Sequence, residues 1–90
     1  MNAYIVTYDL RNQRNYPAVY AALKRYHDVI PLLESSWGIT SSCDAMTILN
    51  DLRNHIDRDD RLFIVRASSN WSSLQLDAGA IAWFRRNVAA

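Results

Sequence analysis

Asp9 is the residue of this chain that is best placed to do chemistry. It lies near the end of residues 4–10, whose β-branched and aromatic residues are typical of a strand. A carboxylate at the point where a strand runs into a loop can reach solvent, a metal ion or a substrate. Magnesium prefers such hard oxygen ligands, but one aspartate is too few, so a two-fold axis between two chains would have to supply a second. The alternative is a structural acid that caps a turn or pairs with Arg11 or Arg14.

Other residue types with chemical potential form no comparable pattern. The sequence has no His–Cys pair with zinc-ligand spacing and no glycine-rich phosphate loop, and Ser35 and Ser36 lack the sequence of a nucleophile elbow. We expect the three tryptophans, Trp37, Trp71 and Trp83, to pack in the core and in a dimer interface rather than to stack on bases.

The helices that must position Asp9 follow from the spacing of apolar residues. This spacing predicts helices over residues 16–27, from a cap at Ser41 or Ser42 to about residue 56, and over residues 77–87. Asn15 is a plausible N-cap for the first of them, and Pro17 lies in its first turn, where a missing N–H costs little.

Two further segments are predicted to be extended. Residues 29–40 form either one bent strand or two short ones, and Pro31 excludes a central, fully paired position at its own site. Gly38 marks a bulge or a close backbone approach. Residues 61–67 have a nearly continuous apolar centre, which predicts an interior strand.

This order of elements predicts one domain over residues 1–90, an α/β fold built as an α+β sandwich, with helices on one face of a small sheet and an added C-terminal helix. If residues 29–40 form a hairpin, the order becomes the ferredoxin-like βαββαβ. The open face of such a sheet needs a cover, and a second copy of the chain is the usual one, so we expect a homodimer.

Composition restricts the function classes. Ten Lys and Arg residues against nine Asp and Glu residues give a net charge of +1, without the basic excess of a strong DNA binder, although charges segregated by face would still allow nucleic acid to bind. A single cysteine, Cys43, excludes a disulfide within the chain. We see no signal peptide and no membrane-spanning segment, so we expect a cytoplasmic protein without a membrane partner.

The motifs together resemble a known family. An apolar strand ending in Tyr8-Asp9-Leu10, Arg14 and Asn15 at a helix start, a later strand containing Ser36 and a polar turn beginning at Asp57 resemble the small CRISPR-associated Cas-two proteins and virulence-associated protein D. The similarity covers most of the chain in element order, and its most specific part is the first strand.

The resemblance implies a ferredoxin-like homodimer in which the strand-end aspartates meet near a two-fold axis. In some members this pair is proposed to hold magnesium for cleavage of RNA or DNA phosphodiesters, and other members are non-catalytic subunits of an integration complex. Carried over, Asp9 would be the catalytic residue and the Mg²⁺ ligand. Ser36 would lie nearby, and Arg11 or Arg14 would contact phosphate.

The chain departs from this family in ways that keep other functions open. It has fewer basic residues, carries Val29-Ile30-Pro31 where the family has a Gly-centred turn, and ends in a Trp-containing helix in place of a final strand. A stand-alone, toxin-like or phage-borne relative is therefore at least as plausible as a CRISPR protein. The alternatives to a nuclease are a non-catalytic interaction module of the same fold and, more weakly, a regulatory domain for a small ligand.

Overall fold

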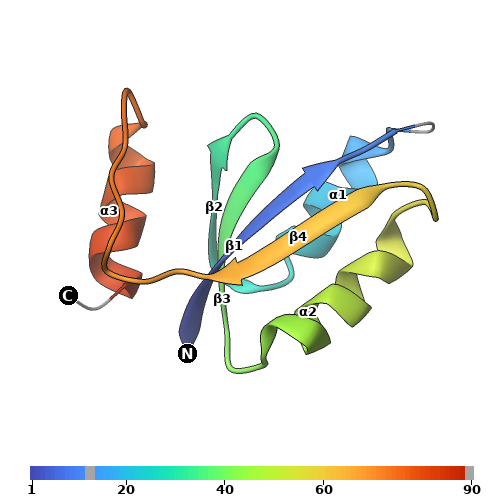
Figure 1. The fold of residues 1–90 in the computed structure, drawn as a ribbon, viewed down its shortest axis with the longest axis horizontal. Coiled ribbons are helices and arrows are strands. Elements are labelled where there is room, and N and C mark those ends of the chain that lie inside the picture. The colour runs from blue at the N-terminus through green and yellow to red at the C-terminus, as the bar shows by residue number, and fades with distance from the viewer. Residues whose placement is uncertain (12–13, 89–90) are drawn as a thin grey trace.

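The computed structural model describes residues 1–11 and 14–88. These residues contain, in chain order, β1 (Asn2–Asp9), α1 (Tyr16–Leu23), β2 (His27–Leu33), β3 (Ser36–Ser41), α2 (Ala45–Leu52), β4 (Arg61–Arg66) and α3 (Ala78–Asn87) (Figure 1). The strands form one antiparallel sheet in the order β2-β3-β1-β4. The result is a small α+β structure, the coarse class that the sequence predicts.

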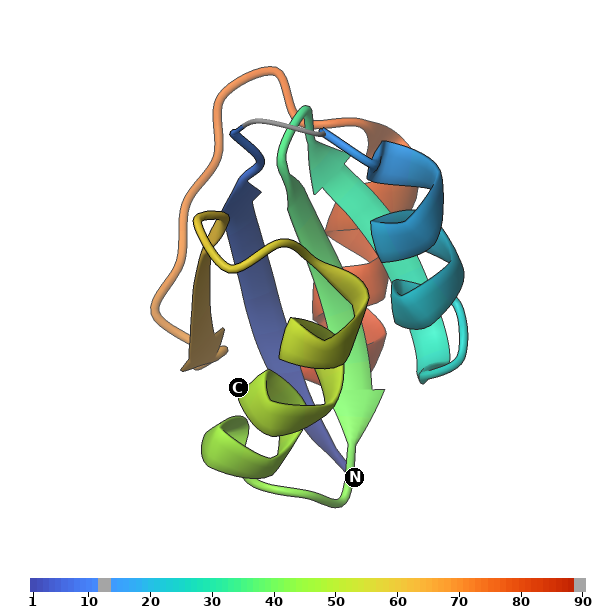
Figure 2. The ribbon, with the colours of Figure 1, turned by 90° about the vertical axis from the view of Figure 1, so that its right-hand side faces the viewer.

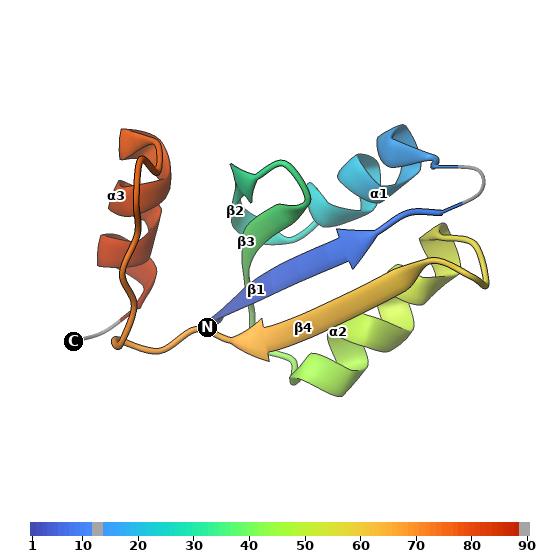
Figure 3. The same ribbon diagram turned by 45° about the horizontal axis from the view of Figure 1, so that its top comes forward.

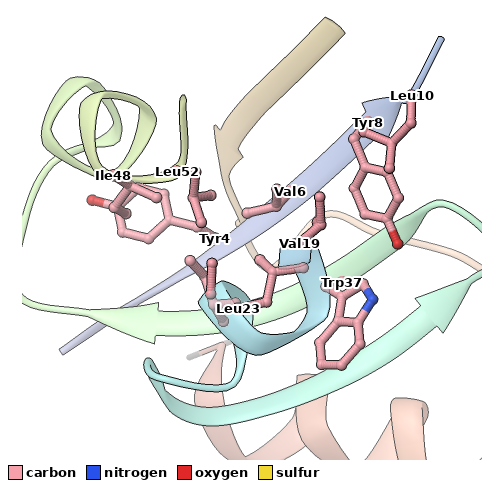
Figure 4. Packing of buried hydrophobic residues seen from close by; sticks show 11 residues of the cluster. Tyr4, Val6, Tyr8, Leu10, Val19, Leu23, Trp37, Ile48 and Leu52 are labelled. Atoms are coloured by element: carbon pink, nitrogen blue, oxygen red, sulfur yellow. The ribbon is translucent and has the colours of Figure 1, made fainter. Parts of the chain in front are cut away.

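The face of the sheet that α1 and α2 cover, here called the inner face, carries the main core. Alternate residues of β1 point to it, and its buried members include Tyr4, Val6, Tyr8, Leu23, Trp37, Ile48 and Leu52 (Figure 4). Side chains of a strand point alternately to opposite faces, so this set lies on one side of β1. Ile48 and Leu52 are the buried residues of α2.

The added C-terminal helix α3 packs on the opposite, outer face, so that the helices do not all share one side (Figure 2). Ala3, Trp83 and Phe84 form a second buried cluster there, with the half-buried Ile5 and Ile30 against it. Part of the face for which the sequence predicts a second copy as cover is therefore covered by the chain's own α3.

Four hydrogen bonds to Asp28 connect α3 to β2. The Trp83 indole N–H donates to the backbone carbonyl of Asp28 at 2.7 Å. The Asp28 carboxylate accepts two hydrogen bonds from Arg86, at 2.8 and 2.9 Å, and one from Asn87 at 2.8 Å. These hydrogen bonds hold the pKa of Asp28 down at about 2.

The observed boundaries refine the predicted ones. Asn15 caps α1 as predicted, but the helix ends at Leu23 rather than at residue 27, because β2 already begins at His27. Residues 29–40 belong to two strands joined by a turn at residues 34–35, and Pro31 lies on edge strand β2. The cap of α2 is Asp44, whose Oδ1 accepts from the Thr47 N–H at 2.9 Å, rather than Ser41 or Ser42.

The predicted position of β4 is wrong. The apolar run of residues 61–67 predicts an interior strand, whereas β4 pairs only with β1 and lies at the edge of the sheet (Figure 3). Leu62 and Ile64 pack against the inner core, but Phe63 and Val65 point to the outer face, where their exposed fractions are 62% and 44%. Within one chain, therefore, only Leu62 and Ile64 of the four central apolar residues of β4 pack in the core.

Candidate functional site

Asp9 ends β1 with its carboxylate in solvent, as the sequence predicts for a strand-end acid. Its side chain is 63% exposed, and its nearest ionic partner is the Arg11 guanidinium, with a nitrogen–oxygen distance of 3.6 Å. Across the sheet, Asp9 stands opposite Arg61, the first residue of β4. An exposed pair of this kind contributes little to stability, so the carboxylate is available to another ligand.

The outer face of the sheet presents Asp9 together with apolar residues. Register pairs Thr7 with Phe63 and Ile5 with Val65, and residues directly opposite in an antiparallel sheet share a face. The C-terminal end of β1, which carries Asp9, lies away from α3 (Figure 3), whereas Ile5 packs against the cluster that contains Trp83 and Phe84. Asp9 and Arg61 therefore form the charged rim of an exposed apolar patch, defined here as Phe63 and Val65.

Arg11 and Arg14 occupy the loop that follows Asp9. The Arg11 N–H donates to Asp60 Oδ1 at 2.7 Å, which ties this loop to the turn before β4. Arg14 has a positive φ of 50°, and its Nε donates to the Arg11 carbonyl at 3.1 Å. Arg11 thus lies beside Asp9, whereas the Arg14 guanidinium bonds to the Arg11 backbone.

Ser36 shares the outer face with Asp9, one strand away and two residues back along β1. It begins β3 opposite Thr7, and it is half-buried. It lines a groove of about 340 Å³ with apolar residues of the segment between β4 and α3, among them Trp71 and Leu74. The structure gives no contact between Ser36 and Asp9 in the residues it describes.

An acidic group in the turn before β4, predicted from the sequence only as a polar turn, lies near this site. One carboxylate oxygen from each of Asp57, Asp59 and Asp60 lies within 4.8 Å of the others. Asp60 closes two loops, because its oxygens accept from the Arg11 N–H and from the Asp57 N–H at 2.9 Å. The sequence shows three acids within the four residues Asp57-Arg58-Asp59-Asp60, but it does not predict their hydrogen bond to Arg11.

Among the described residues, the possible magnesium ligands are Asp9 and the acidic group of Asp57, Asp59 and Asp60. Asp9 has the donor chemistry that Mg²⁺ prefers and the exposure to bind it, whereas Asp60 already serves the backbone. A site built on Asp9 therefore needs a second carboxylate from a second copy, or a substrate phosphate and water.

The comparisons with known proteins supply no family. The chain matches no family model, and no curated protein matches it. Within the described residues, no helix has the length and apolar character needed to cross a membrane.

Proposed function

We propose that the chain is a homodimeric interaction module of ferredoxin-like fold, related to the Cas-two and virulence-associated D proteins and acting in the cytoplasm. The succession β1-α1-β2-β3-α2-β4 with all neighbours antiparallel supports the ferredoxin-like assignment. The Tyr8-Asp9-Leu10 strand end supports the family relationship.

The exposed apolar patch on β4 is the observation that carries this proposal. Phe63 and Val65 are large apolar residues on an edge strand, and within the described residues no element covers them. An exposed apolar patch rimmed by charges is typical of a protein–protein interface. The rim here contains both signs, Asp9 and Arg61, so its charge does not oppose the approach of a second copy of the patch.

Two measurements test the interaction module, one of self-association and one of nucleic-acid binding. The molar mass of the purified chain in solution reports the homodimer, and titration with single-stranded RNA and duplex DNA at two salt concentrations reports nucleic-acid binding. We expect a dimer and no salt-sensitive affinity for either nucleic acid. A strong affinity that falls steeply with salt would indicate a phosphate-binding protein and contradict the module.

A second candidate function, magnesium-dependent phosphodiester cleavage, is favoured by one observation: the exposed Asp9 carboxylate beside Arg11 and Arg61. In this function Asp9 would hold the ion, which when bound polarises the phosphate and activates water. Arg11, Arg14 and Ser36 would contact the substrate. Cleavage that requires Mg²⁺ and is lost in Asp9→Asn would establish it, whereas cleavage that persists in this variant would come from another group or a contaminant.

A further inference from the structure

β4 has the sequence of an interior strand and the position of an edge strand. Its centre, Leu62–Val65, is entirely apolar, as in strands that have neighbours on both sides. Among the described residues of one chain it has a neighbouring strand on one side only, β1. A strand added to the free side of β4 would give it the surroundings that its sequence predicts.

The backbone of β4 is oriented to accept such a strand. The Ala67 N–H donates to the Ala3 carbonyl at 2.9 Å, immediately after the paired residues of β1 and β4. In an antiparallel ladder alternate residues turn both backbone groups to the same neighbour, so Val65, Phe63 and Arg61 bond to β1. Leu62, Ile64 and Arg66 consequently direct their N–H and C=O groups to the free side.

The other edge of the sheet has backbone features that block pairing, whereas β4 has charged side chains only at its two ends, Arg61 and Arg66. Edge strand β2 contains Pro31, which has no N–H, and its register with β3 is irregular at two places. β4 pairs with β1 in unbroken register and contains neither proline nor glycine. Natural proteins block edges of this second kind unless a strand is meant to pair there.

We propose that the strand added to β4 is β4 of a second copy, paired antiparallel across a two-fold axis, so that two sheets become one. This inference rests on the homodimer proposed above and specifies its interface. Charge is the reason to choose a second copy. The five residues 57–61 at the start of β4 contain three aspartates and two arginines, a net charge of −1, and Arg66 ends the strand, so an antiparallel copy brings the acidic start of each β4 against the basic end of the other.

One register satisfies both the hydrogen bonds and the charges. Residues with free backbone groups must face each other, and pairing Leu62 with Ile64 of the second copy meets this condition. The same register places Asp60 opposite the second copy's Arg66 and Phe63 opposite the second copy's Phe63. The two phenylalanines then form a pair without mutual hydrogen bonds, whose Cβ atoms are about 4.5–5.5 Å apart, and aromatic pairs at this position stabilise a sheet.

The proposed interface also determines how far apart the two Asp9 residues of the dimer lie. Each Asp9 ends a β1 strand, and the two β1 strands are separated by both copies of β4, three strand spacings or about 14 Å in all. Two Asp9 carboxylates so arranged cannot share one metal ion. Edge pairing therefore supports the interaction module over a nuclease with a shared magnesium.

Disulfide trapping tests the register directly, in a Cys43→Ser background that removes the native thiol. Cysteine is introduced singly at the exposed residues Arg61, Phe63 and Val65, whose substitution leaves the inner core intact. Under mild oxidation we expect Phe63→Cys to convert almost completely to a covalent dimer. Arg61→Cys and Val65→Cys should each stay monomeric on denaturing gels, but a mixture of the two should form the covalent heterodimer, because the register places these residues opposite each other.

The outcomes separate this inference from the proposal on which it rests. A parent chain that is monomeric in solution overturns both the homodimer and the edge pairing. A dimeric parent whose Phe63→Cys variant fails to crosslink, or whose Val65→Cys variant crosslinks on its own, retains the homodimer and overturns the β4 pairing. If the chain associates only with a different protein and not with itself, the proposal that a second copy pairs with β4 is likewise overturned.

Discussion

The indole ring of Trp83 lies directly over the α-carbon of Gly38, in the space that a side chain at Gly38 would need. A Cβ atom built on Gly38 would stand 2.7 Å from the ring, closer than such atoms approach in real proteins. Trp83 is fully buried, and its N–H is bonded to the Asp28 carbonyl, so the ring cannot easily move aside. Glycine at position 38 is therefore what allows α3 to pack on the outer face.

We predict that Gly38→Ala lowers the free energy of unfolding by about 1–3 kcal/mol, as overpacking of a core does. The matched control is Gly79→Ala. An added Cβ there meets only Ile30 Cδ1 at 3.6 Å, an ordinary contact, and alanine favours a helix over glycine by about 1 kcal/mol. Urea unfolding followed by tryptophan fluorescence compares the two. Equal stability of both variants would contradict the close packing of Trp83 on Gly38.

The hydrogen-bonded ion pair between Asp28 and Arg86 should make stability depend on pH in the acid range. The folded-state pKa of Asp28 is depressed to about 2, below its ordinary value, so its contribution is complete near neutral pH and is lost as pH falls from about 4 toward 2. Arg86 is half exposed, which screens the pair, so we expect a contribution of about 1–2 kcal/mol.

Asp28→Asn measures this contribution without changing the backbone. Asparagine tolerates the positive φ of 45° at this position. The variant should be less stable than the parent at pH 7, and the difference should shrink as pH falls below 4. A difference that is constant from pH 7 to pH 3 would show that the carboxylate charge does not hold α3.

Two tyrosines with different hydrogen bonds should respond differently to loss of the hydroxyl. The Tyr26 hydroxyl donates to Asp51 Oδ2 at 2.6 Å, and burial together with this bond raises the pKa of Tyr26 above its ordinary value. The buried Tyr8 hydroxyl makes no hydrogen bond of ordinary geometry among the described residues, although the Tyr20 and Trp37 side chains lie beside it. Thermal unfolding should show Tyr26→Phe destabilised by about 1–2 kcal/mol and Tyr8→Phe unchanged or slightly more stable. The reverse order would contradict both assignments.

Asp9 should be dispensable for folding whatever its function. Its only ionic contact in the described residues is an exposed pair with Arg11, and such pairs are worth less than about 1 kcal/mol. We predict that Asp9→Asn has an unfolding midpoint in urea close to that of the parent. Any loss of binding or cleavage in this variant can then be assigned to the carboxylate itself. A large loss of stability would instead give Asp9 a structural role.

Features that depend on neighbours in the chain were predictable from the sequence. The Asn15 cap, the helices around residues 16–23, 45–52 and 78–87, and the exposed acid at the end of β1 all follow from local composition and spacing. The helix cap at Asp44 was missed because Ser41, Ser42 and Asp44 are all good cap residues within four positions, and only the folded backbone selects one of them.

Features that depend on distant residues were not predictable from one sequence. Nothing local distinguishes an interior strand from an apolar edge strand, so the position of β4 could not be read from Leu62–Val65. The tie between Arg11 and Asp60 joins residues 49 positions apart. The packing of Trp83 on Gly38 likewise required the three-dimensional structure, although the glycine itself indicated a close approach at this position.

The most direct test of the homodimer is the molar mass in solution of three proteins: the parent chain, Phe63→Asp and the control Leu74→Asp. Phe63 and Leu74 are both large, apolar and exposed, at 62% and 86%, but only Phe63 lies on β4. The account predicts twice the 10.4 kDa mass of one chain for the parent and for Leu74→Asp, and the mass of a single chain for Phe63→Asp. A parent with the mass of one chain, or a Phe63→Asp variant that stays dimeric, would contradict it.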